Sequence, residues 1–296
     1  MATETIKFIQ SELASKKFAF LSANEMQTLM GNFGEFSCDD EQEFEKFWDY
    51  SVAQRDESEN EVYPYKGTLV SYFSMNIKKD FNSINRSSSH NLQNDSEGRS
   101  IEFIDPTTVG EESKFRIHKQ WPLNADNNPI ILGLLRIVFE IISRPSSIQW
   151  KAAPGTDPKS SIYEPMMSGF RVTKSNSSLR YKNGEPGPEG VHHDLCELTI
   201  VVLVNRKNIT FKSAGNRIWS LDQKSGKPNE NDLKSTRLLK ELVLRDRFDT
   251  LFLLDREAKH EALPIIIDKN YGNKEEEKCA VRDVLTFEVR RSRQNM

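Results

Sequence analysis

The first fifty residues carry apolar side chains at the spacing of amphipathic helices. A first helix is predicted by the recurrence of Ile6, Ile9, Leu13 and Phe18. Ser22 or Asn24 is placed to cap a second helix. The segment Asp39–Trp48 opens with acidic residues and continues with aromatic ones, which favours a third short helix. The chain therefore begins with a helical layer.

The pattern changes over the next hundred residues. Segment 63–77 is rich in β-branched and aromatic residues and predicts one or two strands. Residues 80–98 are rich in Ser, Asn and Asp, which is typical of an exposed loop. Residues 130–142 are almost continuously apolar and predict a buried helix, which Pro145 ends.

From Trp150 onward, short apolar runs alternate with turn-rich segments. Several short strands separated by turns indicate an antiparallel sandwich or barrel. The predicted fold class is therefore mainly β with flanking helices (α+β). We expect one domain over residues 1–296, with the helical layer and first strands in 1–150 and the β core in 151–292.

Composition and charge exclude several classes of protein. The chain is 36% hydrophobic and 29% charged, with 41 basic and 44 acidic residues. This balance argues against a nucleic-acid binder with a strongly basic surface. Three cysteines, odd in number and far apart, suggest no disulfide framework. With no secretory h-region at the N-terminus and no apolar run long enough for a bilayer, a cytoplasmic protein without membrane association is expected.

A metal constellation lies in the predicted β core. His192 and Asp194 are two residues apart in PEGVHHDLCELTIVV, and residues i and i+2 of a strand point to one face. That arrangement would leave His193 facing away. His260 follows beside another apolar run. Two imidazoles and one carboxylate form a facial triad with open coordination positions, as non-haem Fe(II) oxygen chemistry requires.

A carboxylate anchor is predicted on the last strand. Arg282 opens the segment RDVLTFEV, and alternation places Val284 and Thr286 on the same face. A guanidinium presents a planar fork to a carboxylate, and a neighbouring hydroxyl adds a hydrogen bond. Arg282 could instead pair with Asp283 or Glu288 at the surface.

Several blocks of the chain resemble a known family. They are GFRVTK, PGPEGVHHD, ELTIVVLVNRKNIT, RDRFDTLFLLDREAKHEALPI and RDVLTFEV, which together cover Ser168–Arg290, with a looser likeness over Lys119–Glu140. They are similar to the bacterial and fungal 2-oxoglutarate oxygenases that include isoleucine 4-hydroxylase and related free-amino-acid hydroxylases. The chain departs from the family pattern at Leu195, where the family has Gly, and at Phe211–Gly215, which lacks the family's Glu.

The resemblance implies a double-stranded β-helix (jelly-roll) core and an oxidoreductase of the dioxygenase type. It implies Fe(II) held by His192, Asp194 and His260, and 2-oxoglutarate as cosubstrate bound by Arg282 with Thr286. Oxygen is consumed, succinate and carbon dioxide are coproducts, and ascorbate is expected to help in vitro. The implied substrate is a small free amino acid, plausibly aliphatic, which is hydroxylated, desaturated or cyclised.

Other residues leave alternatives open. Arg171 could grip a substrate carboxylate or face solvent, and Gln120 and Trp121 could line the substrate pocket or simply pack. Arg290, Arg291 and Arg293 are expected to form a solvated basic tail. Two other functions also remain: a cupin-like metal enzyme that does not use 2-oxoglutarate, and a non-catalytic binding module.

Overall fold

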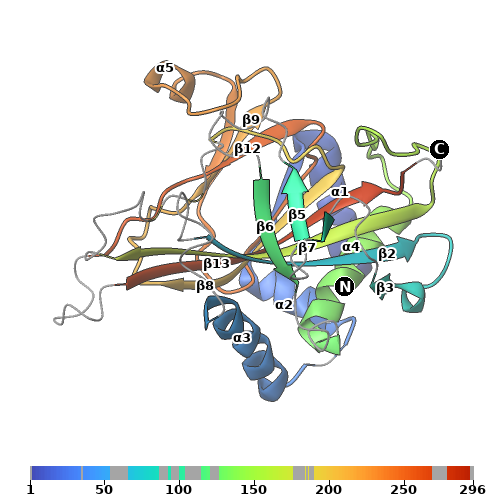
Figure 1. Cartoon of the computed structure of the whole chain (residues 1–296). Helices are drawn as coiled ribbons and strands as arrows, with labels where there is room; N and C mark the ends of the chain where they lie inside the picture. Colours follow the sequence, from blue (N-terminus) through green and yellow to red (C-terminus); the bar gives the residue numbers. More distant parts are fainter. Residues whose placement is uncertain are drawn as a thin grey trace.

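A computed structural model gives the fold of the chain (Figure 1). It describes residues 2–34, 36–53, 66–86, 93–94, 100–103, 115–120, 127–175, 184, 186, 190–268 and 279–293. Much of the predicted loop 80–98, and Trp121, lie outside the described residues.

Two β-sheets form the body of the protein. The large sheet has ten strands in the order β1-β11-β8-β13-β7-β2-β6-β5-β4, with β3 paired to β2. Its strands are β1 (Phe18–Leu21), β2 (Lys66–Asn76), β3 (Asn85–Arg86), β4 (Gln93–Asn94), β5 (Ser100–Phe103), β6 (Phe115–Gln120), β7 (Ile162–Ser175), β8 (Leu198–Lys207), β11 (Thr250–Leu253) and β13 (Cys279–Arg291). The small sheet, in the order β10-β9-β12, consists of β9 (Asn216–Ser220), β10 (Leu238–Leu242) and β12 (Ala258–Ala262). All described pairings are antiparallel except that of β2 with β6.

The four long helices pack on one face of the large sheet, and the small sheet, with a short fifth helix beside it, lies over the other face (Figure 1). The helices are α1 (Ala2–Lys16), α2 (Ala23–Gly31), α3 (Cys38–Ala53), α4 (Pro129–Ser143) and α5 (Glu230–Leu233), with a 3-10 turn η1 (Phe81–Ser83). Side chains from α1, α2 and α4 share one hydrophobic core with side chains from β7, β8 and β13. This arrangement confirms the predicted class, mainly β with flanking helices.

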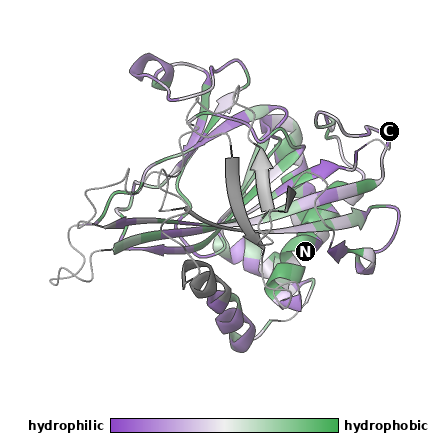
Figure 2. Cartoon of the chain, viewed as in Figure 1, coloured by the Kyte–Doolittle hydropathy of each residue, from purple (hydrophilic) through white to green (hydrophobic). Residues whose placement is uncertain are grey.

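Helix α4 is the centre of the helical layer. Asn128 caps it by accepting a hydrogen bond from the Ile130 amide at 3.0 Å, and Pro129 occupies the first turn, where its missing N–H costs nothing. Figure 2 shows α4 as mostly hydrophobic, whereas α3 and α5 are largely hydrophilic. A helix that is apolar on nearly every side must be buried, and α4 is enclosed by α1, α2 and the sheet.

Strand β13 has two faces with different partners. Leu285, Phe287 and Val289 are almost fully buried against the helical core. The alternate residues point to the opposite side, toward the small sheet. A single strand therefore joins the core that stabilises the fold to the surface that forms the site.

The structure also departs from the predicted elements. The first helix was expected to reach Phe18, but Lys17 has a φ of 75° and ends it, and Phe18 begins the short strand β1. Strand β10 and helix α5 were not predicted, since five residues (LLKEL) and four residues (ENDL) are too few to show a hydrophobic period. Among the described residues, no helix has the length and apolarity needed to cross a membrane.

Candidate functional site

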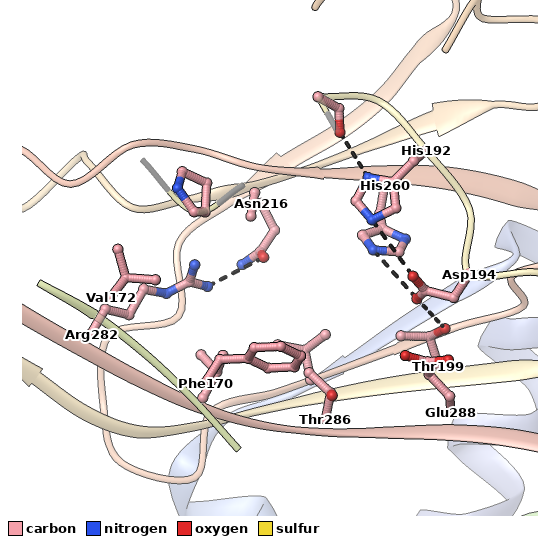
Figure 3. Close-up of a pocket in the computed structure, with 15 residues that line it drawn as sticks. Phe170, Val172, His192, Asp194, Thr199, Asn216, His260, Arg282, Thr286 and Glu288 are labelled. Carbon is pink, nitrogen blue, oxygen red and sulfur yellow. Dashed lines mark hydrogen bonds and ion pairs between the residues drawn. The ribbon is translucent and has the colours of Figure 1, made fainter. Parts of the chain in front are cut away.

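A pocket lies between β13 of the large sheet and the small sheet (Figure 3). It is lined by Phe170, Val172, Pro186, Gly190, His192, Asp194, Thr199, Val201, Asn216, His260, Ala262, Arg282, Val284, Thr286 and Glu288. The inward face of β13 supplies four of these residues, at alternate positions from Arg282 to Glu288. The pocket therefore collects polar groups from several strands within partly apolar walls.

The three predicted metal ligands meet at one end of this pocket. The Nε2 atoms of His192 and His260 lie 3.6 Å from the two carboxylate oxygens of Asp194, one imidazole on each oxygen. The centroids of the two rings are 4.3 Å apart. One donor atom from each of the three residues lies within 4.8 Å of the others, so a single ion could contact all three.

A pair of backbone hydrogen bonds brings the two histidines together. The His192 amide donates to the His260 carbonyl at 2.9 Å, and the His260 amide donates back at 2.8 Å. His260 belongs to β12, but residues 190–194 form only isolated bridges followed by a bend. The prediction that His192 and Asp194 lie on a regular strand was wrong, because the chain turns between bridges to Gly226 and to His260.

Gly190 makes this turn possible. Its φ is +61°, and a Cβ atom at this position would lie 2.5 Å from the backbone of Gly226. Its carbonyl accepts the hydrogen bond from His192 Nδ1 at 2.9 Å. With that proton on Nδ1, the lone pair of Nε2 points toward Asp194 and is available to a metal.

The protonation states suit a divalent metal. Burial lowers the pKa of His260 to about 4, so its imidazole is neutral at physiological pH. Burial opposes ionisation of Asp194, but the two imidazoles, Arg290 and the Thr199 hydroxyl outweigh it and lower the pKa of this carboxyl. Two neutral imidazoles and one carboxylate are the ligand set of a non-haem Fe(II) site, so the residues present fit this metal.

Asp255 lies behind the triad, and no motif or spacing in the sequence pointed to it. Its carboxylate, fully buried, accepts hydrogen bonds from the amides of Asp194 at 2.9 Å and Cys196 at 3.1 Å. It also lies 3.8 Å from His260 Nδ1. Burial and the nearby Asp194 raise the pKa of Asp255 well above its usual range. This one side chain thus contacts two members of the triad that are far apart in the sequence, Asp194 and His260, and helps to orient both.

Arg282 occupies the opposite end of the pocket (Figure 3). It is 3% exposed, and its Nη2 donates to Asn216 Oδ1 at 3.3 Å. Its Nε has no hydrogen-bond partner, and no described carboxylate is within ion-pair distance. Burial and the neighbouring Arg206 lower the pKa of Arg282 to about 10, which leaves it charged at neutral pH.

A buried guanidinium without an anionic partner is costly, and an anionic ligand in the pocket would offset that cost. The position therefore fits the carboxylate of a cosubstrate. The alternative pairing of Arg282 with Asp283 does not occur, because Asp283 faces the other side of the sheet. Thr286 lines the same pocket wall, and its hydroxyl donates to the Ser168 carbonyl at 3.4 Å.

The structure does not bring every predicted residue to the site. Arg171 lies on the opposite face of the sheet, where its Nε and Nη2 donate to the Asp283 carboxylate at 2.6 and 2.9 Å. It lines a second cavity and cannot grip a ligand beside the triad. Gln120 is the last residue of β6, and its backbone pairs with Val70. Its side chain is not among the described ones, so its predicted place in the substrate pocket stays a prediction.

The predicted basic tail was wrong for Arg290 and Arg291, whereas Arg293 is exposed as expected. Arg290 and Arg291 belong to β13, and Arg291 pairs with the buried Glu197 at 3.2 Å. Arg290 Nη2 donates to the backbone carbonyl of Asp194 at 3.0 Å and to Glu288 Oε2 at 2.8 Å. These contacts explain why β13 continues through Arg290 and Arg291 although both carry a charge.

Three polar residues of the pocket were not predicted as site residues from the sequence. Glu288 has the same strand parity as Arg282 and Thr286, so extending the alternation would have found it. Thr199, on β8, donates to Asp194 Oδ2 at 3.2 Å. Asn216, on β9, could not be found this way, because no local pattern links it to Arg282.

Comparisons with known proteins agree with this geometry. The model of the 2OG-Fe dioxygenase family matches residues 127–288. No curated protein sequence matches the chain. The fold is similar to that of the Fe(II)/α-ketoglutarate-dependent dioxygenase TqaL, with a TM-score of 0.69, 19% identity, and 99% of this chain and 89% of the other covered.

Two further structures share the fold. A bsmA homologue from Methylobium petroleophilum PM1 has a TM-score of 0.62 and 15% identity, with 98% of this chain and 94% of the other covered. IDO from Bacillus thuringiensis has a TM-score of 0.59 and 14% identity, with 98% and 100% covered. The jelly-roll fold expected from the sequence is therefore confirmed.

Replacing one imidazole of the triad should abolish metal binding. We expect His260→Ala to weaken Fe(II) affinity by more than about a hundredfold, beyond the effect typical of residues that only support a ligand. The measurement is equilibrium dialysis under nitrogen followed by elemental analysis. His193→Ala is the matched control, since His193 does not line the pocket. Equal iron content in both variants would contradict the assignment.

Acid should destabilise the metal-free protein. The pKa of His260 is about 4 in the folded state, against 6.5 for an unperturbed histidine. Protonation therefore favours the unfolded chain, so the stability contributed by neutral His260 is complete above pH 6.5 and is lost toward pH 4. Urea unfolding across this range should show a fall in unfolding free energy that is shallower in His260→Gln. Parallel curves for the two proteins would refute this expectation.

Proposed function

Because the chain belongs to the 2OG-Fe dioxygenase family and is an Fe(II)/2-oxoglutarate-dependent oxygenase, we propose that it oxidises an unactivated C–H bond of a small aliphatic free amino acid. Fe(II) is held by His192, Asp194 and His260, and 2-oxoglutarate by Arg282 with Thr286. The observation that carries this assignment is one pocket with a His-Asp-His cluster at one end and, at the other, a buried arginine that has no carboxylate partner among the described residues.

The residues divide the work between the two ends of the pocket. The triad would hold the ion through three ligands, and a facial set of this kind leaves further coordination positions for other ligands. Arg282 fixes the distal carboxylate of 2-oxoglutarate and so sets its orientation toward the ion. When bound, the metal with 2-oxoglutarate and oxygen supplies the oxidising power, and succinate and carbon dioxide are the coproducts.

The walls between these ends support an aliphatic substrate. Phe170, Val201, Val284 and Ala262 line the pocket and present apolar surface. Such walls exclude water and match an aliphatic side chain, while the polar groups orient the molecule. The resemblance of residues 168–290 to free-amino-acid hydroxylases supports the same class. Hydroxylation, desaturation and ring closure are all outcomes of this chemistry.

We also propose that residues 1–296 act as one oxygenase domain. The helices of residues 2–31 and 129–143 share a continuous core with β7, β8 and β13. Removing the N-terminal helices would expose the apolar back of the strand that carries Arg282.

Arg282 should control the affinity for 2-oxoglutarate. We expect Arg282→Ala to raise the KM for 2-oxoglutarate by about 10- to 100-fold, the effect of losing a charge-assisted hydrogen-bonded pair. Initial rates of succinate release give this value. Arg237→Ala, which removes a partly exposed arginine that pairs with Asp232, is the control and should leave the KM unchanged. An unaltered KM in Arg282→Ala would remove the cosubstrate assignment.

The substrate class can be identified directly. Purified protein with Fe(II), ascorbate and 2-oxoglutarate is supplied with each of the twenty free amino acids, and succinate release is measured. Valine, leucine or isoleucine should stimulate release, because the pocket walls are apolar. Mass spectrometry should show a product that gains one oxygen, or one that loses two hydrogens. If no amino acid stimulates release while 2-oxoglutarate is still consumed slowly, the substrate proposal is wrong.

A further inference from the structure

The inward face of β13 carries opposite charges at its two ends. Arg282 stands at one end and Glu288 at the other, six residues along the strand, or about 20 Å at the usual rise of a β-strand. Between them lie the uncharged Val284 and Thr286. Figure 3 places Glu288 next to Thr199, on the side of the pocket where Asp194 lies.

Glu288 is the charged group that the proposed function leaves unassigned. Among the described residues that line the pocket, the other charged side chains are Asp194, a proposed metal ligand, and Arg282, the proposed cosubstrate anchor. The Glu288 side chain is 14% exposed, so water screens it only partly. Beside the ion itself, the Glu288 carboxylate is therefore the charged side chain left to meet a substrate at the metal end of the described pocket.

Arg290 holds this carboxylate in place. Its Nη2 donates to Glu288 Oε2 at 2.8 Å and to the Asp194 carbonyl at 3.0 Å. Arg290 itself does not line the pocket, so its charge stays behind the carboxylate. The two oxygens of a carboxylate offer about four acceptor positions in all, more than a single donor can use.

We infer that Glu288 forms the subsite for the ammonium group of the substrate. This inference rests on the proposed oxygenase function of the same pocket. An ammonium group donates up to three hydrogen bonds, and its attraction to a partly buried carboxylate is stronger than the same contact in water. The aliphatic part of the molecule would then lie against the apolar walls near the metal end.

Among the described residues that line the pocket, Arg282 is the only Arg or Lys, so none is left for a substrate carboxylate. Arg171, the earlier candidate, lies on the opposite face of the sheet and pairs with Asp283. Recognition by the described residues of the pocket thus depends more on the ammonium group of the substrate than on its carboxylate. Amino acids and the corresponding primary amines are expected to bind, whereas carboxylic acids that lack the amino group are not.

The test measures binding rather than turnover. Protein loaded with Fe(II) and 2-oxoglutarate under nitrogen is titrated with probes, and the change in the metal-to-cosubstrate charge-transfer absorption gives Kd. The probes are L-isoleucine, 2-methylbutylamine and 3-methylpentanoate, which share one aliphatic chain and differ in charge. The valine and leucine series are titrated in the same way. The proteins are the wild type, Glu288→Gln and the control Glu230→Gln on the exposed helix α5.

We expect wild-type and Glu230→Gln proteins to bind the amino acid and the amine, and to bind the des-amino acid at least tenfold more weakly. Glu288→Gln should weaken binding of the two ammonium probes by about 10- to 100-fold, as for loss of a charged hydrogen-bond partner. It should leave the affinity for the des-amino acid unchanged or improved. This dependence on probe charge separates a binding role from a structural one, which would weaken all three probes alike.

Three outcomes would overturn the inference. They are equal binding of the ammonium probes to wild type and Glu288→Gln, an equal loss for all three probes, and no spectral response of the wild type to any ammonium probe. If the charge-transfer band itself fails to form, the oxygenase assignment fails as well, so the two failures are distinguishable. A normal band in Glu288→Gln shows that the variant is folded and loaded.

Discussion

The candidate metal centre depends on two reciprocal backbone hydrogen bonds between His192 and His260. They join a bend that follows Gly190 to the strand β12, which lies far along the sequence. Side chains on directly opposed residues of an antiparallel bridge point to the same side, so the two imidazoles lie close together, tilted by 56° to one another. The position of Asp194 follows from the same bend. If this bridge were broken, the pocket would persist but its ligand set would separate.

The large sheet serves both stability and chemistry through one strand. On β13, Leu285, Phe287 and Val289 bury apolar surface against the helical core, while Arg282 and Glu288 face the pocket. Burial of the first set supplies the hydrophobic free energy that holds the second set in register. The charged residues are thereby placed on a rigid element, which favours a fixed geometry for ligands.

The site contains several buried titratable groups whose charged forms are costly to remove from water. Arg282 and Asp255 are almost fully removed from water, and the pKa shifts of Asp255, His260 and Arg282 each record burial as the largest cause. Each such group costs free energy unless a partner compensates it. Proteins of this family bind Fe(II) and 2-oxoglutarate, and the 2-oxoglutarate carboxylate proposed to bind at Arg282 would compensate its buried charge. Ligand binding is thus coupled to the stability of the pocket.

Local patterns in the sequence determined a large part of this picture. Helical periodicity and capping residues predicted α1, α2 and α4, and the alternation of β13 placed Arg282, Val284 and Thr286 on one face. The same alternation along the strand also places Glu288 on this face. These features depend on the geometry of adjacent residues, which a single sequence contains.

The tertiary structure decided what local patterns leave open. Parity along β7 and β13 does not say which face meets the pocket; the register, with Arg171 opposite Asp283, puts Arg171 on the far side. The closeness of His192 to His260, and the support from Asp255 and Asn216, likewise arise from pairings between distant segments. Such pairings depend on long-range packing and register, which the spacing of residues along one chain does not specify.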